Sequence, residues 1–216
     1  MDFIKSPKAI EDKSMDLINP FIMDIDLTPE EVTVYSRMIH ASGDVDYGHL
    51  IQTSKGAIEA LAKGCNIYTD VNMVKAGINK NALHALGSEV FCRVSDPEIA
   101  AIAKEKGIAR SMAAMNSFGT DLNGAIIAVG NAPTALYEAI RMVEEDGIKP
   151  ALIIGIPVGF VGAADSKEQL VRRAPCPFIT VRGTKGGSSI VASCVNALMY
   201  NLVKRNNNML FVEGKK

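Results

Sequence analysis

The feature that most constrains this chain is an alternation of two patterns that begins near residue 57. Short apolar runs, partly β-branched, alternate with longer segments that carry the start and stop signals of helices. The apolar runs cover residues 66–69, 89–94, 125–129, 151–156 and 178–181. Nearly continuous apolar strands separated by helices are typical of a parallel sheet that is covered on both faces. We therefore predict an α/β fold, with a doubly wound domain around a mainly parallel sheet.

Two further helices are expected before this alternation. The first covers about residues 7–19, and the second opens at the capping box Thr28-Pro29-Glu30-Glu31 and stops at Gly43. Within the alternation, the sequence predicts helices from 97 to 106, from 110, from 132 to 146 and from 188 to about 204. No repeat or linker divides the chain, so residues 1–216 are expected to form a single domain.

Composition and charge exclude several classes of function. The 23 Lys and Arg residues nearly balance 24 Asp and Glu, and the net charge of -1 lacks the basic footprint of nucleic-acid-binding proteins. The most apolar run, 151–164, is shorter than the ~18 residues of a membrane span, and the charged N-terminus does not resemble a signal peptide. The four cysteines form no CxxC pair, which predicts buried thiols in a reducing compartment and no metal site. We expect a cytoplasmic protein without nucleic-acid or membrane partners.

The second predicted helix carries two basic side chains beside its apolar stripe. Val32, Tyr35 and Ile39 recur at helical spacing and form that stripe, while Arg37 and His40 lie one turn apart on its flank. His40 falls in the last turn, where the helix dipole favours the imidazolium. Such a histidine could deliver a proton and take it back near neutral pH. The alternative is a histidine that only caps the helix end.

Two other polar side chains are candidates for ligand contact. Ser14 lies on the apolar side of the first helix, with Ile10, Leu17 and Ile18. Its hydroxyl either bonds back to the carbonyl of Ile10 or faces a ligand. Arg110 begins a segment of small residues, and it is either a solvated surface group or a bidentate partner for a carboxylate.

Three loops follow apolar strands at the ends where open parallel sheets bind ligands: 130–134, 157–162 and 182–188. In the last of these, Gly186, Gly187 and Ser188 resemble a phosphate-binding loop in composition, because glycines let backbone N–H groups approach an anion. The alternative is a glycine-rich turn that allows close helix packing. Neither a Walker A nor a Gly-x-Gly-x-x-Gly pattern is present, so nucleotide binding lacks its signature. Asp70 and Asp165 each follow a predicted strand, where either residue could be a helix cap or a polar site residue.

Four segments together resemble the precorrin-8X methylmutase family, also called cobalt-precorrin-8 methylmutase. They are RMIHASG at 37–43, GNAPTAL at 130–136, GIPVGFVGAADSK at 155–167 and RGTKGGS at 182–188. The resemblance implies an isomerase of corrin biosynthesis that moves a methyl group from C-11 to C-12 of a modified tetrapyrrole. The product would be hydrogenobyrinate or its cobalt-containing counterpart, cobyrinate. It also implies no cofactor, any cobalt being carried by the substrate macrocycle, and a homodimer with active sites at the subunit contact.

The resemblance also implies roles for individual residues. His40 matches the family's catalytic histidine, and Ser14 and Arg37 match substrate-contacting positions, which Arg110 is expected to join. The remaining residues predicted to bind substrate lie in the matching loops: Asn131, Gly186, Gly187 and Ser188. Two other classes of function remain as alternatives: a non-catalytic tetrapyrrole carrier or sensor on the same scaffold, and a nucleotide-dependent α/β enzyme that uses the loop 183–188.

Overall fold

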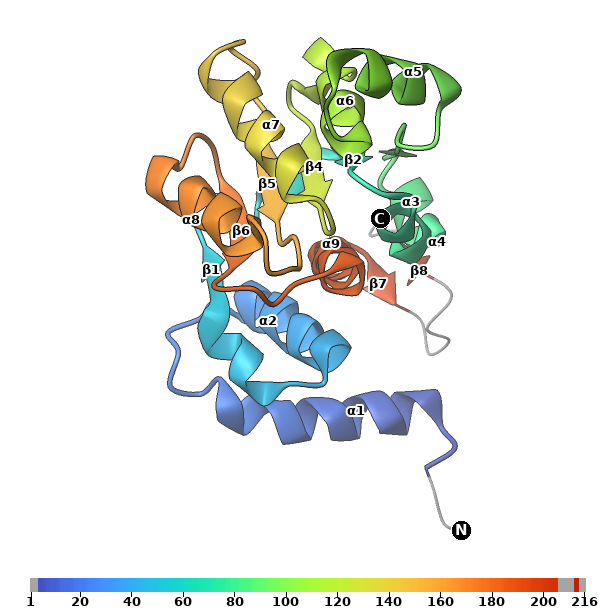
Figure 1. Cartoon of the computed structure of the whole chain (residues 1–216). Helices are drawn as coiled ribbons and strands as arrows, with labels where there is room; N and C mark the ends of the chain where they lie inside the picture. The colour runs from blue at the N-terminus through green and yellow to red at the C-terminus, as the bar shows by residue number, and fades with distance from the viewer. Residues whose placement is uncertain (1–3, 206–211, 214–216) are drawn as a thin grey trace.

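A six-stranded sheet forms the centre of the computed structural model, which describes residues 4–205 and 212–213 (Figure 1). Its strands are β1 (Ile51–Thr53), β2 (Ile67–Thr69), β3 (Val90–Phe91), β4 (Ile126–Val129), β5 (Leu152–Gly155) and β6 (Phe178–Val181). Their order is β1-β6-β5-β4-β2-β3, and all neighbours are parallel except β1 and β6. The predicted α/β fold with a mainly parallel sheet is confirmed.

The antiparallel strand β1 was not expected from the sequence. Its three residues pair with β6 in the register Ile51↔Val181 to Thr53↔Ile179. The segment is too short and too polar to show the alternation that identifies a strand. It forms because β6 would otherwise leave a row of backbone groups without partners at this edge. At the opposite edge, β3 is shorter than the predicted run 89–94, since it pairs with β2 alone.

Alternate side chains of the buried strands enter two separate apolar cores. In β4, Ile126 and Ala128 belong to one core and Ile127 and Val129 to the other, and all four are fully buried. Successive side chains of the strand therefore point to opposite faces of the sheet, and both faces are apolar. This is expected for a parallel sheet that lies between two helical layers. This is why the sequence shows continuous apolar runs and not alternation with polar residues.

Helices cover both faces of the sheet (Figure 1). One layer contains α2 (Pro29–Ser42), α3 (Asn72–Gly77), α4 (Lys80–Ala85) and α9 (Ser188–Leu202), and α1 (Pro7–Ile18) lies outside α2. The other contains α6 (Arg110–Asn116), α7 (Pro133–Glu144) and α8 (Ala163–Arg173), with α5 (Pro97–Lys106) packed on α6. Within residues 4–205 and 212–213, no helix is long and apolar enough to cross a bilayer.

Two predictions about local structure need correction. The last helix was expected to reach about Lys204, but α9 ends at Leu202 and Lys204–Arg205 form β7, which pairs antiparallel with β8 (Val212–Glu213). Of the apolar residues predicted on one side of α1, Ile18 is buried, whereas Ile10 and Leu17 are 44% and 59% exposed. They are exposed because α1 lies in an outer position, where it packs against α2 and not against the sheet.

The predicted capping box at the start of α2 is confirmed. The Glu31 N–H donates to Thr28 Oγ1 at 3.2 Å, and the Thr28 N–H donates to Glu31 Oε2 at 2.9 Å. These bonds satisfy two of the N–H groups that a helix leaves without partners at its first turn. At the other end, α2 stops at Gly43 in the left-handed conformation, with φ of +66°, as predicted.

Replacing Thr28 with alanine removes this cap. We expect Thr28→Ala to lower the free energy of unfolding by about 1 kcal/mol, measured by urea denaturation. The control is Thr33→Ala, which removes a hydroxyl from the interior of the same helix, where it donates to the Pro29 carbonyl at 3.3 Å. An equal loss of stability in both variants would contradict the capping explanation.

Candidate active site

The loops that follow β5 and β6 contact each other at the end of the sheet where the parallel strands have their carboxyl ends. This end is called the carboxyl edge below. The Gly187 N–H donates to the Ile156 carbonyl at 3.0 Å, and the Gly159 N–H donates to the Thr184 carbonyl at 3.1 Å. Gly186 must be a glycine, because a Cβ there would lie 2.4 Å from the Ile156 carbonyl oxygen. The predicted glycine-rich loop is thus fixed in place by backbone contacts.

The loop after β4 joins the same assembly. Gly130 packs directly on the first residue of α9, where an added Cβ would lie 2.8 Å from Ser188 Cα. The structure therefore brings the predicted residues Asn131, Gly186, Gly187 and Ser188 to one edge of the sheet. Asn131 is exposed there, while Ser188 is 8% exposed.

Asp70 holds the loop after β4 in place. It follows β2, is fully buried, and accepts hydrogen bonds from the backbone N–H groups of Gly130, Asn131 and Ala132 at 2.8–2.9 Å. Burial raises the pKa of Asp70, and the three N–H donors act against that shift because they stabilise the carboxylate. Asp70 was expected to be either a helix cap or a polar site residue. It does not cap α3, whose N-cap residue is Val71, and its carboxylate instead fixes the loop that carries Asn131.

Arg110 lies close to the same edge. It is the first residue of α6, it is exposed, and the hydroxyl of the next residue, Ser111, lies 3.2 Å from that of Thr134 at the start of α7. The starts of α6 and α7 are therefore adjacent, and Arg110 is exposed at the start of α6.

His40 is exposed in the last turn of α2, and an ion pair connects the segment after this helix to the glycine-rich loop. Lys185 of the loop pairs with Asp44, which follows Gly43, and the ammonium holds the pKa of Asp44 below its usual range. Ser42 Oγ donates to the Ile39 carbonyl at 2.8 Å and accepts from the Asp44 N–H at 3.1 Å, so the chain between His40 and Asp44 is fixed.

Arg37 and Ser14 form a second group, at the contact between α1 and α2. The Arg37 guanidinium pairs with Glu11 of α1 and stacks over the Tyr200 ring of α9, 4.8 Å from the ring centroid. Ser14 lies one turn after Glu11, and its hydroxyl donates to the Ile10 carbonyl at 2.8 Å. Of the two readings considered for Ser14, the bond back to Ile10 is therefore present.

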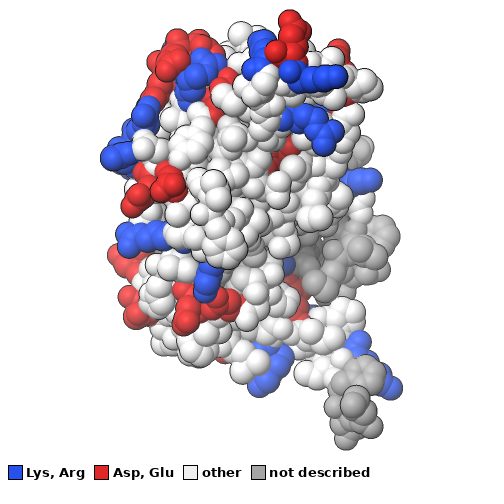
Figure 2. All heavy atoms as spheres, viewed as in Figure 1, with Lys and Arg blue, Asp and Glu red and all other residues white. Residues whose placement is uncertain are grey.

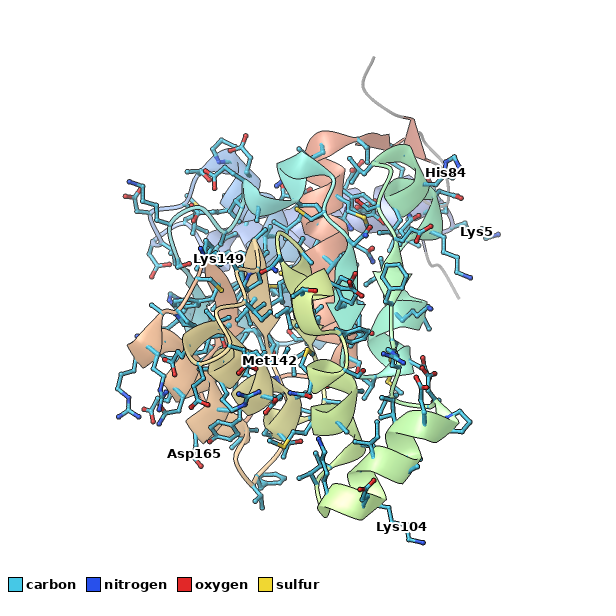
Figure 3. The ribbon with its side chains drawn as sticks, turned by 90° about the horizontal axis from the view of Figure 1, so that it is seen from above. Lys5, His84, Lys104, Met142, Lys149 and Asp165 are labelled. Atoms are coloured by element: carbon cyan, nitrogen blue, oxygen red, sulfur yellow. The ribbon has the colours of Figure 1, made fainter. Side chains whose placement is uncertain are left out.

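Two contacts at this edge involve side chains that were not predicted from the sequence as site residues. One is the Asp44–Lys185 pair. The other is Lys167 of α8, which is 1% exposed and donates from Nζ to the Lys185 carbonyl at 2.6 Å. A signal existed, because Lys167 lies at helical spacing between the buried residues Ala163 and Leu170. Asp165 is exposed in the first turn of α8 (Figure 3).

The surface around these loops includes exposed apolar side chains. Charged side chains surround a mostly uncharged central area of the face that Figure 2 shows. Val158, Phe160 and Val161, in the loop after β5, are 44%, 96% and 90% exposed. Across the described ranges 4–205 and 212–213, no three His, Cys, Asp or Glu side chains are grouped as a metal ion would require. The arrangement offers backbone N–H groups, an arginine and a histidine around an apolar surface.

Comparison with known proteins gives one consistent result. A family model described as precorrin-8X methylmutase matches residues 9–201. A cobalt-precorrin-8 methylmutase of Leptospira interrogans is 39% identical, over 92% of this chain and 95% of that protein. A precorrin-8X methylmutase of a Sinorhizobium species is also 39% identical, over 91% and 96%. The crystal structure of a precorrin-8X methylmutase from Thermus thermophilus has a TM-score of 0.80 and 37% identity, covering 89% and 94%.

We expect Asp70→Asn to lower the free energy of unfolding by about 3 kcal/mol in urea denaturation, because an amide cannot accept all three N–H bonds and its own NH2 group opposes them. The matched control is the exposed residue Asp165, for which Asp165→Asn should change stability by less than about 0.5 kcal/mol. Equal effects of the two substitutions would show that the carboxylate charge of Asp70 does not hold the loop.

Proposed function

We propose, from the premise that this chain belongs to the precorrin-8X methylmutase family of intramolecular methyl transferases in cobalamin biosynthesis, that His40 carries the proton chemistry of its reaction. The proposed substrate is precorrin-8X or cobalt-precorrin-8, and the proposed step moves the methyl group from C-11 to C-12 of the macrocycle. Any cobalt belongs to the substrate. The family match favours this reaction over a non-catalytic carrier and over a nucleotide-dependent enzyme.

The observation that carries this proposal is the position of His40. It is exposed in the last turn of α2, and the Asp44–Lys185 pair connects that turn to the glycine-rich loop. A histidine side chain can donate a proton to a ring nitrogen and recover it after the shift. A methyl shift within a conjugated ring breaks one carbon–carbon bond, forms another and consumes no co-substrate. Protonation that stabilises the rearranged system is therefore the help that the protein would supply.

The carboxylate arms of the substrate would bind to cationic side chains and backbone N–H groups. Arg110 is exposed at the start of α6, and the first N–H groups of α9 follow Gly186 and Gly187. A guanidinium and the N-terminal amides of a helix are the partners that carboxylates prefer. Arg37, which pairs with Glu11 one turn from Ser14, would contact a carboxylate at the junction of α1 and α2. The exposed apolar loop with Phe160 would cover the flat face of the macrocycle.

The outer face of α1 supports the proposed homodimer. Ile10 and Leu17 of α1 are 44% and 59% exposed, with Ser14 between them in the sequence, and Phe21, in the 3-10 turn that follows the helix, is 48% exposed. Exposed apolar side chains grouped in this way are typical of a surface that another protein covers. With a second copy on this face, Ser14 would lie at the subunit contact, as the family resemblance implies.

Removing the His40 side chain should separate catalysis from binding. We expect His40→Ala to lower kcat at least 100-fold, measured by the spectral conversion of precorrin-8X to hydrogenobyrinate, because a positioned acid–base group contributes on this scale. Affinity for the corrinoid product should stay within about threefold in fluorescence-quenching titrations, since the carboxylate partners remain.

The matched control is His84→Ala, which removes another exposed histidine from the last turn of a helix, α4, at the back of the molecule (Figure 3). It should convert substrate at the wild-type rate. Wild-type turnover by His40→Ala would overturn the acid–base role. Binding of substrate without conversion by the unaltered protein would instead identify a carrier.

The dimer proposal predicts that a charge on the outer face of α1 dissociates the protein. We expect Leu17→Lys to convert a dimer to a monomer in sedimentation velocity and to lower activity, because burying an unpaired ammonium at the contact is unfavourable. The control is Met73→Lys on α3, where the side chain is 72% exposed and lies on a different face of the molecule. This variant should remain dimeric. A monomeric wild type, or a dimeric Leu17→Lys variant, would contradict the proposal.

A further inference from the structure

Lys167 is a buried charge that the proposed reaction does not use. Its side chain is 1% exposed within α8, and in the described part of the chain it takes part in no ion pair. Burial lowers the pKa of Lys167 to about 8. An apolar side chain of similar size would fill this space without the desolvation cost, so stability alone does not explain a lysine here.

The contact that Lys167 makes fixes the orientation of one peptide unit. Its Nζ donates to the Lys185 carbonyl at 2.6 Å. In a planar trans peptide the carbonyl and the following N–H point in opposite directions, so the Gly186 N–H points away from Lys167. The neighbouring peptide is fixed in the same way, because the Thr184 carbonyl accepts from the Gly159 N–H at 3.1 Å.

The rest of the loop has little freedom to compensate. The Gly187 N–H is used by the Ile156 carbonyl, and Gly186 packs against the backbone of Ile156 and Pro157. The side chain of Lys185 pairs with Asp44 at the end of α2. Lys185 therefore connects two sides of the site: its carbonyl accepts from α8, and its ammonium binds the segment that follows His40.

We propose that Lys167 is a positioning residue for the methylmutase reaction: by holding the Lys185 carbonyl inside the protein, it turns the Gly186 N–H outward to bind a carboxylate of the substrate. This inference rests on the proposed binding of substrate carboxylates by the loop 182–188. Without the ammonium, the peptide between Lys185 and Gly186 can rotate, and an outward carbonyl would repel a carboxylate. The role is one of orientation, since the Lys167 ammonium is bound to the Lys185 carbonyl and acts through that peptide.

The first test is Lys167→Met, which keeps an apolar chain of similar length and removes the donor. We expect KM to rise about tenfold while kcat stays within about threefold, because one oriented N–H bond to a charged group is lost in substrate binding and the proton chemistry is untouched. The control is Lys149→Met, which removes the same charge from an exposed position just before β5, at the opposite end of that strand from the loops of the site. It should leave KM unchanged.

A second variant distinguishes orientation from general stability. Lys167 borders a cavity of about 410 Å³ whose lining includes Thr180 and Arg182, through which a small molecule can approach the space left by Lys167→Ala. Propylammonium, which matches the three carbons and the nitrogen that are removed, should lower the raised KM of Lys167→Ala towards the wild-type value, whereas propanol of the same length should not. A purely structural role would instead lower the melting temperature, lower kcat together with substrate affinity, and show no preference for the amine.

The probe for the loop itself is hydrogenobyrinate, compared with a derivative whose carboxylates are converted to amides. If wild-type protein binds both equally, the proposed carboxylate binding fails, whatever Lys167 does. If the wild type prefers the acid and Lys167→Met keeps the full preference and the wild-type KM, the positioning role of Lys167 is overturned. A preference that falls about tenfold in Lys167→Met supports the inference.

Discussion

The parallel pairing of β2, β4, β5 and β6 is the constraint on which the rest of this structure depends. Parallel neighbours need helical crossovers, and these cover both faces of the sheet and bury its strands completely. The same pairing places the carboxyl ends of the strands at one edge. Each loop that leaves this edge has its neighbours within hydrogen-bonding distance, so the site is built from contacts between loops that are distant in sequence.

Buried charges hold these contacts, and each joins two elements. Asp70, after β2, binds the loop after β4, and Lys167 of α8 binds the loop after β6. Glu138 of α7, 3% exposed, accepts from Asn116 of α6 at 2.7 Å and from Arg141. A buried charge with fixed partners tolerates few alternative geometries, because rotating any donor away leaves it uncompensated. This keeps the carboxyl edge rigid while its outer surface stays open.

The distribution of charge matters more for this protein than its total. A net charge of -1 gives no basic footprint across the whole sequence, yet the proposed ligand is a polycarboxylate. A few cations would suffice where each has a defined place: Arg110 in solvent at the start of α6, Arg37 over Tyr200, and Lys185 bound to Asp44. The remaining affinity would come from backbone N–H groups, which do not appear in any count of charged residues.

The sequence by itself determined the elements and their class. Continuous apolar runs identified β2, β4, β5 and β6, and the capping box identified the start of α2. The loops after the strands identified the end of the sheet where Gly130 packs on Ser188. These signals are local, because they reflect side-chain periodicity and backbone chemistry within a few residues. The sequence did not reveal β1, which depends on the free edge of β6. Nor did it give the bonds of Asp70 and Lys167, whose partners lie about 60 and 18 residues away. Only the tertiary structure decided these, because a charge buried far from its partner in sequence has no local pattern.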